Sequence, residues 1–369
     1  MTPAFRLMDK LKKLPHWTQC WLVALLVMAL FAPALSGKLP LVFISDSQMY
    51  FPAFFPKTQI DQQNPADIPW KEKDGWALWP LWSHDPDFRS PGAKPYEAPS
   101  FQHPFGTDQS GRDVLARMIY GTRQTLLFSG IGLIVALGIG VLLGAWAGST
   151  SRGIRIKWTA IIGGILGGIF WLTVEDWASP FLYVWFPWLG GWLGQSIPKV
   201  KTITLHPDSW LTPLSAVLTA FPRLIFLLIL SAWFSPGLLL LAAFIGGLSW
   251  AGTFRMVRTI TQTWYGGTEK QTLDGLGIPL FRQWMKHIWP NLWQVLLPGV
   301  AASLGSFILL EATLGFLQIP LPEAHYGWGS LLTQAKRNPD AWWLVVFPGI
   351  FLVLSLWTVY RWKKNPETD

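Results

Sequence analysis

The sequence predicts an all-α polytopic membrane protein, and three observations indicate this class. Hydrophobic residues make up 51% of the 369 residues, while charged residues make up only 14%. The apolar residues gather in runs that are long enough to cross a hydrocarbon core of about 30 Å. The 25 Trp residues are typical of the aromatic belts that lie at membrane interfaces.

The net charge of +8 arises from basic residues beside the ends of the apolar runs and in short loops. This pattern indicates a positive-inside topology and argues against nucleic-acid binding. Cys20 is the one cysteine of the sequence, which excludes an intrachain disulfide and indicates no cysteine-based metal or thiol site. We therefore expect a lipid bilayer, and no nucleic acid, among the partners of the chain.

Residues 1–17 form a basic segment that we expect on the cytoplasmic side of the membrane. Its one acid is Asp9, and its basic residues are Arg6, Lys10, Lys12 and Lys13. The apolar run that follows predicts a first transmembrane span over residues 18–36. A cleaved signal peptide is the alternative, because Ala32-Pro33-Ala34 resembles a small-residue cleavage site. The proline inside that site and the further spans downstream favour an uncleaved span.

Residues 37–104 predict a small extracytoplasmic insertion. Six Lys and Arg residues stand against eight Asp and Glu residues here, and this mildly acidic balance fits the side opposite the cytoplasm. We expect Met49–Phe55 and Trp76–Trp82 to pack together as the aromatic core of this insertion.

Apolar runs predict the next spans of the chain. Residues 105–151 contain a signature segment and a Gly-rich run, Thr125–Gly148, whose glycines allow close helix approach. Residues 152–212 contain two shorter runs, Trp158–Val174 and Phe181–Leu193, which predict an extra membrane hairpin and loop. An interfacial or re-entrant segment is the alternative for the second run.

Residues 213–361 predict the remaining membrane core, and residues 362–369 predict a cytoplasmic tail. A polar cytoplasmic loop over residues 254–291 interrupts this core. The predicted spans are Leu214–Phe234, Leu238–Trp250, Val295–Leu317 and Trp342–Trp357. With the first span, the Gly-rich span and the two crossings of the hairpin they give eight crossings, which place both termini in the cytoplasm.

Two short helices are expected inside the polar loop. Thr268 and Gln271 have the spacing of a capping box, which predicts a helix with Thr268 as its N-cap. Gly275 and Gly277 are expected to end that helix. Pro279 suits the first turn of a second helix, which has one apolar face and one basic face.

The second helix is expected to break or kink at Pro290 before the next span begins. Trp284 and Ile288 lie on its apolar face. Such a helix fits a groove on a partner protein or the surface of an anionic lipid layer, and its periodicity alone favours neither.

Several polar residues outside this loop are candidates for a functional role. His84, Asp85 and Asp87 share no fixed ligand spacing, so we expect solvated loop residues rather than metal ligands. Glu311 lies in an apolar run, where an acid is costly, and we expect it to be paired or wet near the outer end rather than to couple ions. Arg223 is expected to snorkel to the inner interface rather than to line a pathway.

A glycine-bounded stretch precedes the second predicted span. Gly106 and Gly111 permit turns around Asp108. Asp108, Arg112 and Asp113 are expected to pair locally, as a helix cap with a surface salt bridge, rather than to contact a substrate.

The polar loop resembles the cytoplasmic EAA loop of ABC importer permeases. Gly277 falls on the glycine of that pattern, and Ile288-Trp289-Pro290-Asn291 falls on its Ile-Leu-Pro-Asn ending. Gln271-Thr272-Leu273 replaces the Glu-Ala-Ala, so we expect docking to depend on shape and on the apolar face more than on one charge. The residues that the resemblance implies for coupling to an ATPase are Gln271, Thr272, Leu273, Gly277, Trp284, Ile288 and Pro290.

A second stretch is similar to the LGTDxxGRDVLSR…YGAR signature of dipeptide and oligopeptide permeases. The residues that carry this match include Gly106, Thr107, Asp108, Gly111, Arg112 and Asp113. Further similarities are Ser249-Trp250-Ala251-Gly252, Glu311–Leu317, Trp328-Gly329 and Phe347-Pro348-Gly349. Together they cover about residues 105–150 and 214–360, and the long insertion is similar to the branch that includes microcin-C-type peptide permeases.

The resemblance implies the transmembrane permease subunit of an ATP-driven importer for peptides or similar small solutes, in the inner membrane. It also implies a six-span type I ABC importer core with an extra hairpin. Such a subunit is not an enzyme and holds no cofactor, since the sequence contains no G-x-x-x-x-G-K-[ST] loop and ATP would be bound by partner chains. The implied partners are a second permease subunit, two ATP-binding subunits and an extracytoplasmic solute-binding protein.

An intramembrane enzyme and a secondary transporter are the alternative functions. We find within the predicted spans no nucleophile with a base, no paired acids and no H-E-x-x-H arrangement. The inverted repeats expected of a secondary transporter are not evident. A co-purifying ATPase chain would favour the importer, whereas proton-driven uptake by this chain alone would favour the secondary transporter.

Overall fold

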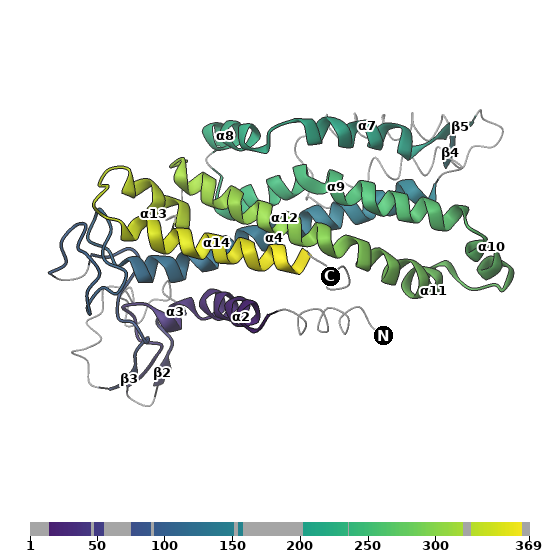
Figure 1. Cartoon of the computed structure of the whole chain (residues 1–369). Helices are drawn as coiled ribbons and strands as arrows, with labels where there is room; N and C mark the ends of the chain where they lie inside the picture. The colour runs from purple at the N-terminus through teal and green to yellow at the C-terminus, as the bar shows by residue number, and fades with distance from the viewer. Residues whose placement is uncertain are drawn as a thin grey trace, which may run out of the picture. The chain divides into compact units, whose positions relative to one another are not determined.

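The computed structural model is mostly helical and divides into two compact units. Unit 1 contains Met1–Ile139, Phe221–Trp250 and Trp289–Asp369, and unit 2 contains Gly140–Ala220 and Ala251–Ile288. The residues that the structure describes are 15–45, 48–54, 75–89, 92–150, 154–157, 202–234, 236–319 and 326–363. Figure 1 labels the elements in chain order.

Four helical segments of the described chain are long and apolar enough to cross a membrane, and a bent pair of helices would add a fifth span. The four are Val114–Ser149, Leu238–Gly266, Leu280–Phe316 and Trp343–Arg361. They agree with the predicted polytopic helical class. The predicted hairpin over 158–197 lies outside the described residues, so the count of eight crossings stays a prediction.

Two of the predicted spans differ from the helices observed. The first is shorter, because α2 (His16–Leu30) ends before the short α3 (Ala32–Leu35) begins. The run Leu214–Phe234 is not one helix but α7 (Pro207–Ala220) followed after a sharp bend by α8 (Arg223–Phe234). Pro222 explains the break, since proline lacks an N–H and disfavours helical backbone at the residue before it.

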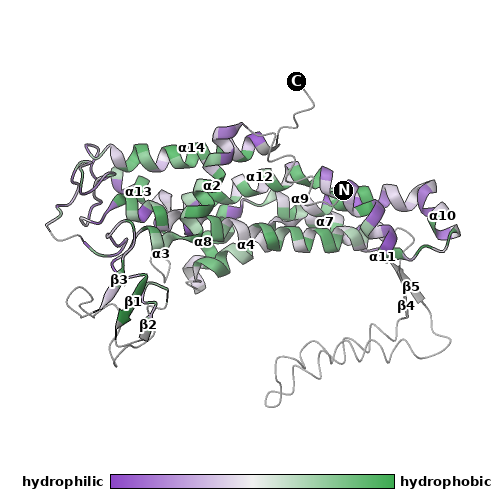
Figure 2. Cartoon of the chain, turned by 90° about the horizontal axis from the view of Figure 1, so that it is seen from below, coloured by the Kyte–Doolittle hydropathy of each residue, from purple (hydrophilic) through white to green (hydrophobic). Residues whose placement is uncertain are grey.

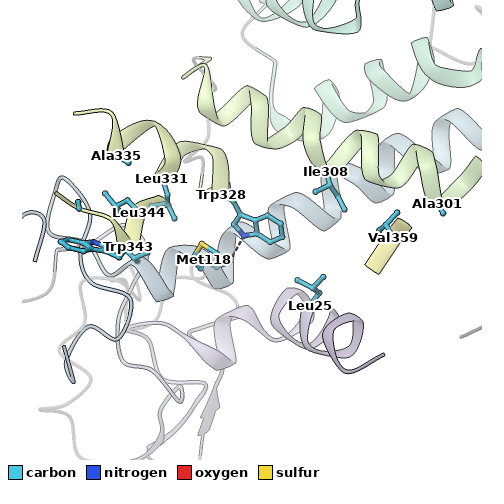
Figure 3. Packing of buried hydrophobic residues seen from close by; sticks show 12 residues of the cluster. Leu25, Met118, Ala301, Ile308, Trp328, Leu331, Ala335, Trp343, Leu344 and Val359 are labelled. Carbon is cyan, nitrogen blue, oxygen red and sulfur yellow. Dashed lines mark hydrogen bonds between the residues drawn. The ribbon is translucent and has the colours of Figure 1, made fainter. Parts of the chain in front are cut away.

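The C-terminal helices form the main core of unit 1. α12 (Trp289–Phe316) packs against both α13 (Trp328–Ala335) and α14 (Trp343–Lys363), which also pack against each other (Figure 1). Trp328 is fully buried and lies between Met118 and Ile308 in Figure 3. Its indole Nε1 donates to the Met118 carbonyl at 3.5 Å. The stretch between the predicted spans Val295–Leu317 and Trp342–Trp357 therefore contains a helix, α13, whose first residue anchors this core.

α2 joins the same core by packing on α14. The Trp21 indole donates to Ser355 Oγ at 3.3 Å, and the rings of Trp21 and Phe351 meet edge to face at 5.0 Å. A second buried cluster lies among α4 (Val114–Ser149), α8, α12 and the first half of α9 (Leu238–Gly266). In that cluster Gly246 lets α9 approach α4 closely, since an added Cβ would lie 2.5 Å from the Gly132 carbonyl oxygen.

The insertion contains a small antiparallel sheet, so the prediction of an all-α chain is wrong here. β1 (Val42–Ser45) lies between β2 (Gln48–Tyr50) and β3 (Trp76–Leu78). Phe43 of β1 is buried and is covered by Leu39, Tyr50, Ala77 and Trp79. The two aromatic segments flank β1, and one residue from each, Tyr50 and Trp79, packs on Phe43 in a shared cluster.

Unit 2 contains α7, the second half of α9 and the polar segment that follows it. Asp208 of α7 forms an ion pair with Arg258 of α9, and Arg255 donates to Thr219 Oγ1 at 3.0 Å. Gly148 lets α4 and α9 approach each other closely, since a Cβ at this position would lie 2.6 Å from Thr261 Cβ.

A two-stranded antiparallel sheet also belongs to unit 2. β4 (Ile154–Lys157) pairs with β5 (Thr202–Leu205), and Lys157 lies opposite Thr202. The pairing places residues 154–157 beside residues 202–205.

Candidate functional site

A short polar helix links two of the membrane-length segments. α10 (Thr268–Gly275) follows α9 and precedes the segment Leu280–Phe316, and none of its residues is buried. Figure 2 shows α10 in hydrophilic colours, whereas α4 and α14 are mostly hydrophobic. The polar loop predicted from the sequence therefore contains an exposed helix, as expected.

The predicted N-cap of α10 is wrong by one residue. Gly267 occupies the N-cap position in extended backbone, and no side-chain hydrogen bond caps the helix. Thr268 is already helical, and its carbonyl accepts a hydrogen bond from Thr272 Oγ1 at 3.0 Å. Because the helix begins at Thr268, Gln271 does not close a capping box and is an exposed residue of the helix.

Gly277 ends α10 as the sequence predicts. Its φ is +66°, a left-handed conformation that glycine adopts without strain. The Gly277 N–H donates to the Asp274 carbonyl at 3.0 Å, and the Ile278 N–H donates to the Leu273 carbonyl at 3.1 Å. These two bonds make a Schellman motif, which turns the chain sharply out of the helix.

The side chain of Gln283 stabilises this turn by hydrogen bonds from α11, and no sequence pattern indicated this role. α11 (Leu280–Gln283) begins after Pro279, and the Gln283 side chain is buried. Its Nε2 donates to Asp274 Oδ1 at 3.0 Å and to the Ile278 carbonyl at 2.8 Å. The hydrogen bonds from Gln283 and then from Lys270 lower the pKa of Asp274. The sequence signal that could have predicted this contact is an Asp and a Gln on opposite sides of a glycine turn, here Asp274 and Gln283.

The second predicted helix does not break at Pro290. α11 runs through a π-helical turn, η2 (Trp284–Ile288), directly into α12. Proline at position 290 cannot donate to the carbonyl four residues earlier, and its ring would clash with it. The wider π turn accommodates that defect, so the helix continues into the membrane-length segment.

The segment from α10 to η2, Thr268–Ile288, exposes large apolar side chains. The most exposed are Leu276, Leu280, Phe281 and Met285, and 78% of Phe281 is accessible. Of the residues predicted for coupling, Gln271, Thr272 and Gly277 are exposed, Leu273, Trp284 and Pro290 are half-buried, and Ile288 is buried. A water-facing turn with an apolar surface can hold a partner protein or a lipid surface.

The family-signature residues fold into a different kind of site, at the start of α4. Asp113 caps this helix, because its Oδ1 accepts from the Ala116 N–H at 2.7 Å. Asp108 is fully buried and pairs with Arg117 Nη1 at 2.6 Å, while its Oδ1 accepts the Ser110 and Arg112 N–H groups. The predicted cap is present, but the ion pair is buried and uses Arg117 instead of Arg112.

The two glycines of the signature occupy left-handed backbone with little free space. Gly106 has φ of +72°, and an added Cβ would lie 2.7 Å from the Trp343 indole nitrogen. Gly111 has φ of +73°, and an added Cβ would lie 3.1 Å from Arg89 Nε. A larger residue at either position would meet backbone strain and a clash together.

The signature cluster, residues Gly106–Arg117, is fastened to the C-terminal helices. Trp343 Nε1 donates to the Thr107 carbonyl at 3.1 Å, and the Gln109 N–H donates to Gln334 Oε1 at 3.2 Å. The glycine of the Trp328-Gly329 pair lets α13 approach α12 closely, because an added Cβ would lie 1.7 Å from the Ala312 carbonyl oxygen. The cluster therefore positions α4 against α12, α13 and α14.

Two further charged residues of unit 1 have polar partners on neighbouring helices. Glu311 of α12 is fully buried and accepts a hydrogen bond from Thr125 Oγ1 at 2.8 Å. This contact agrees with the expectation of a paired acid. Arg223 at the start of α8 donates to Ser306 Oγ at 3.4 Å.

Comparison with known proteins gives relatives that are 26–27% identical to the chain, and the chain spans from about two thirds to nine tenths of their length. The chain is 26% identical over 358 residues to the inner membrane ABC transporter permease protein YejE of Escherichia coli, covering 92% of this chain and 89% of that protein. It is 27% identical over 255 residues to the oligopeptide transport system permease protein OppC of Haemophilus influenzae, covering 69% of this chain and 65% of that protein.

A putative peptide transport system permease protein of Brucella suis is also similar. It is 27% identical over 264 residues, which cover 70% of each chain. No family model matches the chain.

Proposed function

Because the chain is a distant homologue of the permease subunits of peptide and oligopeptide ABC transporters, we propose that it is the permease subunit of an ATP-driven importer. Its cargo is a peptide or a similar small solute. The subunit is a non-catalytic multi-pass protein of the inner membrane, and ATP is bound by partner chains. Both termini lie in the cytoplasm, as the basic segments at the two ends indicate.

The relative from Escherichia coli supports a permease core that carries two additions. Its alignment covers 92% of this chain. The insertion 37–104 and the segment 152–212 are each longer than the uncovered remainder, so the alignment extends into both. The six-span core with an extra hairpin and an extracytoplasmic insertion is therefore the architecture we propose.

The transport pathway is formed with a second permease subunit. An extracytoplasmic solute-binding protein delivers the cargo, and two ATP-binding subunits drive the cycle. The single observation that carries the coupling role is the exposed α10, held in a fixed turn between two membrane-length helical segments.

The geometry of this turn supports its use as a mechanical link. η2 continues into α12 without a break, so a displacement of α11 is transmitted along one helix. Gln283 ties α10 to α11 across Gly277, so the two helices move together. Closure of the ATPase domains against Leu276 and Phe281 would therefore tilt the attached spans and shift the pathway between its two open states.

The test is a proline at the turn. Gly277→Pro forces φ to about −65° where the turn needs +66°, and it removes the N–H that donates to Asp274. We expect the variant to insert in the membrane while uptake of a radiolabelled peptide by cells falls to background. Gly275→Ala is the matched control, since Gly275 is helical and an added Cβ there meets no atom within 4 Å.

Full uptake by inserted Gly277→Pro would contradict the coupling role. Loss of uptake in both variants would also contradict it, because the left-handed turn would then not be what matters.

A further inference from the structure

Three potential metal ligands meet where the insertion approaches the start of α4. They are His84, His103 and Asp113, and each offers one ligand atom within 4.8 Å of the other two. All three belong to unit 1. Residues separated by 19 and 10 positions are brought together by the fold, which explains why ligand spacing in the sequence did not reveal them.

Asp113 is held in place by contacts that leave one oxygen directed at the histidines. Its Oδ1 accepts from the Ala116 N–H at 2.7 Å and from Trp82 Nε1 at 3.3 Å. Its Oδ2 lies 2.8 Å from His103 Nδ1. Both Asp113 and His103 are buried, so this pair is formed away from bulk water.

His84 completes the cluster with a nitrogen that lacks a partner. Its ring stacks on Trp82 at 5.0 Å and meets the His103 ring edge to face at 4.9 Å. His84 Nδ1 is buried and accepts or donates no hydrogen bond among the described residues. A buried imidazole nitrogen without a partner is costly, and a bound cation would satisfy it. His84 lies in a loop as predicted, but the residue is half-buried and its Nδ1 is not reached by water.

We propose that His84, His103 and Asp113 form a binding site for a divalent transition-metal ion of the Zn²⁺ type. Two imidazoles with one carboxylate are ligands that Zn²⁺ prefers, and three protein ligands leave a fourth position for water or another group. Tetrahedral ligands about 2.0 Å from the ion lie about 3.3 Å from one another. The His103–Asp113 pair opens by about 0.5 Å and His84 closes by up to about 1.5 Å to reach this spacing, which side-chain rotation supplies.

The proposed ion has a definite structural consequence. His84 and His103 belong to the insertion, whereas Asp113 is the N-cap of α4. An ion bound to all three joins the insertion to the first membrane-length helix. Trp82 reinforces the joint, because it contacts both His84 and Asp113.

Zn²⁺ titration of the full-length chain tests the site. The chain is purified in detergent without a polyhistidine tag, stripped with chelator, and titrated with Zn²⁺ in a calorimeter. We expect one equivalent to bind and His84→Ala to weaken binding by more than the 10–100-fold that is typical of an outer-shell substitution. His206→Ala, an exposed histidine of the same chain, is the matched control and binds as the wild type does.

Two further variants keep the test decisive if His84→Ala folds poorly. His84→Gln retains much of the side-chain volume, and Asp113→Asn keeps an N-cap acceptor while it removes the charge. Both are expected to lose Zn²⁺ affinity and the rise in melting temperature that Zn²⁺ gives the wild type. Absence of Zn²⁺ binding by the wild type, or equal binding by folded His84→Gln, would overturn the proposal.

Discussion

The signature cluster and the segment Thr268–Ile288 use glycine turns for opposite purposes. Around Gly106 and Gly111 the turns are enclosed, and an added Cβ would meet neighbouring atoms. Around Gly277 the turn is open, and an added Cβ would meet no atom within 4 Å. The first region uses glycine for space and conformation together, whereas the second uses it for conformation alone.

The two regions also differ in how their acidic residues are paired. The buried Asp108 accepts two backbone N–H groups and pairs with Arg117, so its charge is fully compensated inside the fold. The exposed Asp274 is held by Gln283 and Lys270 at a turn that water can reach. A compensated buried charge fixes one geometry, while an exposed turn beside apolar side chains keeps a surface available. The difference indicates an anchor in one region and a contact surface in the other.

Breaking the buried ion pair should give the largest loss of stability. Asp108→Ala leaves the Arg117 charge buried without its carboxylate, which typically costs about 3–5 kcal/mol. We expect a much lower yield of folded protein and a lower melting temperature in detergent. Arg112→Ala is the control, because Arg112 uses its backbone N–H, which the variant retains. Similar stability of the two variants would contradict the anchoring role of the pair.

Gly329→Ala, which places a methyl group between α12 and α13, should give the next largest loss of stability. A Cβ at position 329 would lie 1.7 Å from the Ala312 carbonyl oxygen, so Gly329→Ala has to separate the two helices at a cost of about 3 kcal/mol. Gly349→Ala in α14 meets no atom within 4 Å, and alanine favours helix by up to about 1 kcal/mol. Thermal unfolding should therefore move in opposite directions for these two glycines of the C-terminal region.

Loosening the turn of α10 should have a local effect. Gln283→Ala removes the bond to Asp274 of α10 and the bond to the Ile278 carbonyl in the turn, so amide hydrogens of α10 should exchange faster. Gln271→Ala changes an exposed glutamine of α10 and should leave the exchange as it is. Hydrogen exchange read by mass spectrometry separates the cases, and unchanged exchange in Gln283→Ala would show that the clamp is not needed.

The smallest stability changes are expected at the two glycines of this turn. Gly277→Ala places a side chain in left-handed backbone at a cost of about 1 kcal/mol, while Gly275→Ala gains up to about 1 kcal/mol. The pair should differ in sign in a thermal melt, although neither meets a neighbouring atom. An equal effect of both substitutions would mean that the φ of Gly277 is not fixed by the fold.

Local sequence patterns predicted the conformation of Gly277 well. A glycine after a polar helical stretch is the common signal for a left-handed helix end, and the structure has that turn. The N-cap was one residue off, because Thr268 and Gln271 fit a capping box that the helix start does not use. Pro290 was expected to break or kink the helix; the helix continues, and its distortion is a π turn over Trp284–Ile288.

Contacts between distant segments could not be predicted in this way. Asp108 pairs with Arg117 instead of the nearer Arg112, because α4 turns Arg117 toward the buried carboxylate. The meeting of His84 with His103 and Asp113 depends on how the insertion folds back, which composition does not specify. The sheet around Phe43 was not predicted, because strands of three or four residues are too short to show a clear alternation of apolar and polar residues.

We infer that Phe281 of α11, beside the turn at Gly277, faces the cytoplasm and contacts an ATP-binding subunit. Cys20→Ser removes the one cysteine of the sequence, so single cysteines can be introduced at will. Phe281→Cys places a thiol on the exposed turn, and Leu81→Cys places one on the insertion, where 84% of Leu81 is accessible. A membrane-impermeant maleimide then reports which side each thiol faces in right-side-out and inside-out vesicles.

Labelling with and without the ATP-binding subunits is the most direct test. We expect Phe281→Cys to be labelled only in inside-out vesicles and to become protected when the ATP-binding subunits are present. Leu81→Cys should be labelled only in right-side-out vesicles. Labelling of Phe281→Cys from the outer side, or labelling that is equal with and without the ATP-binding subunits, would contradict it.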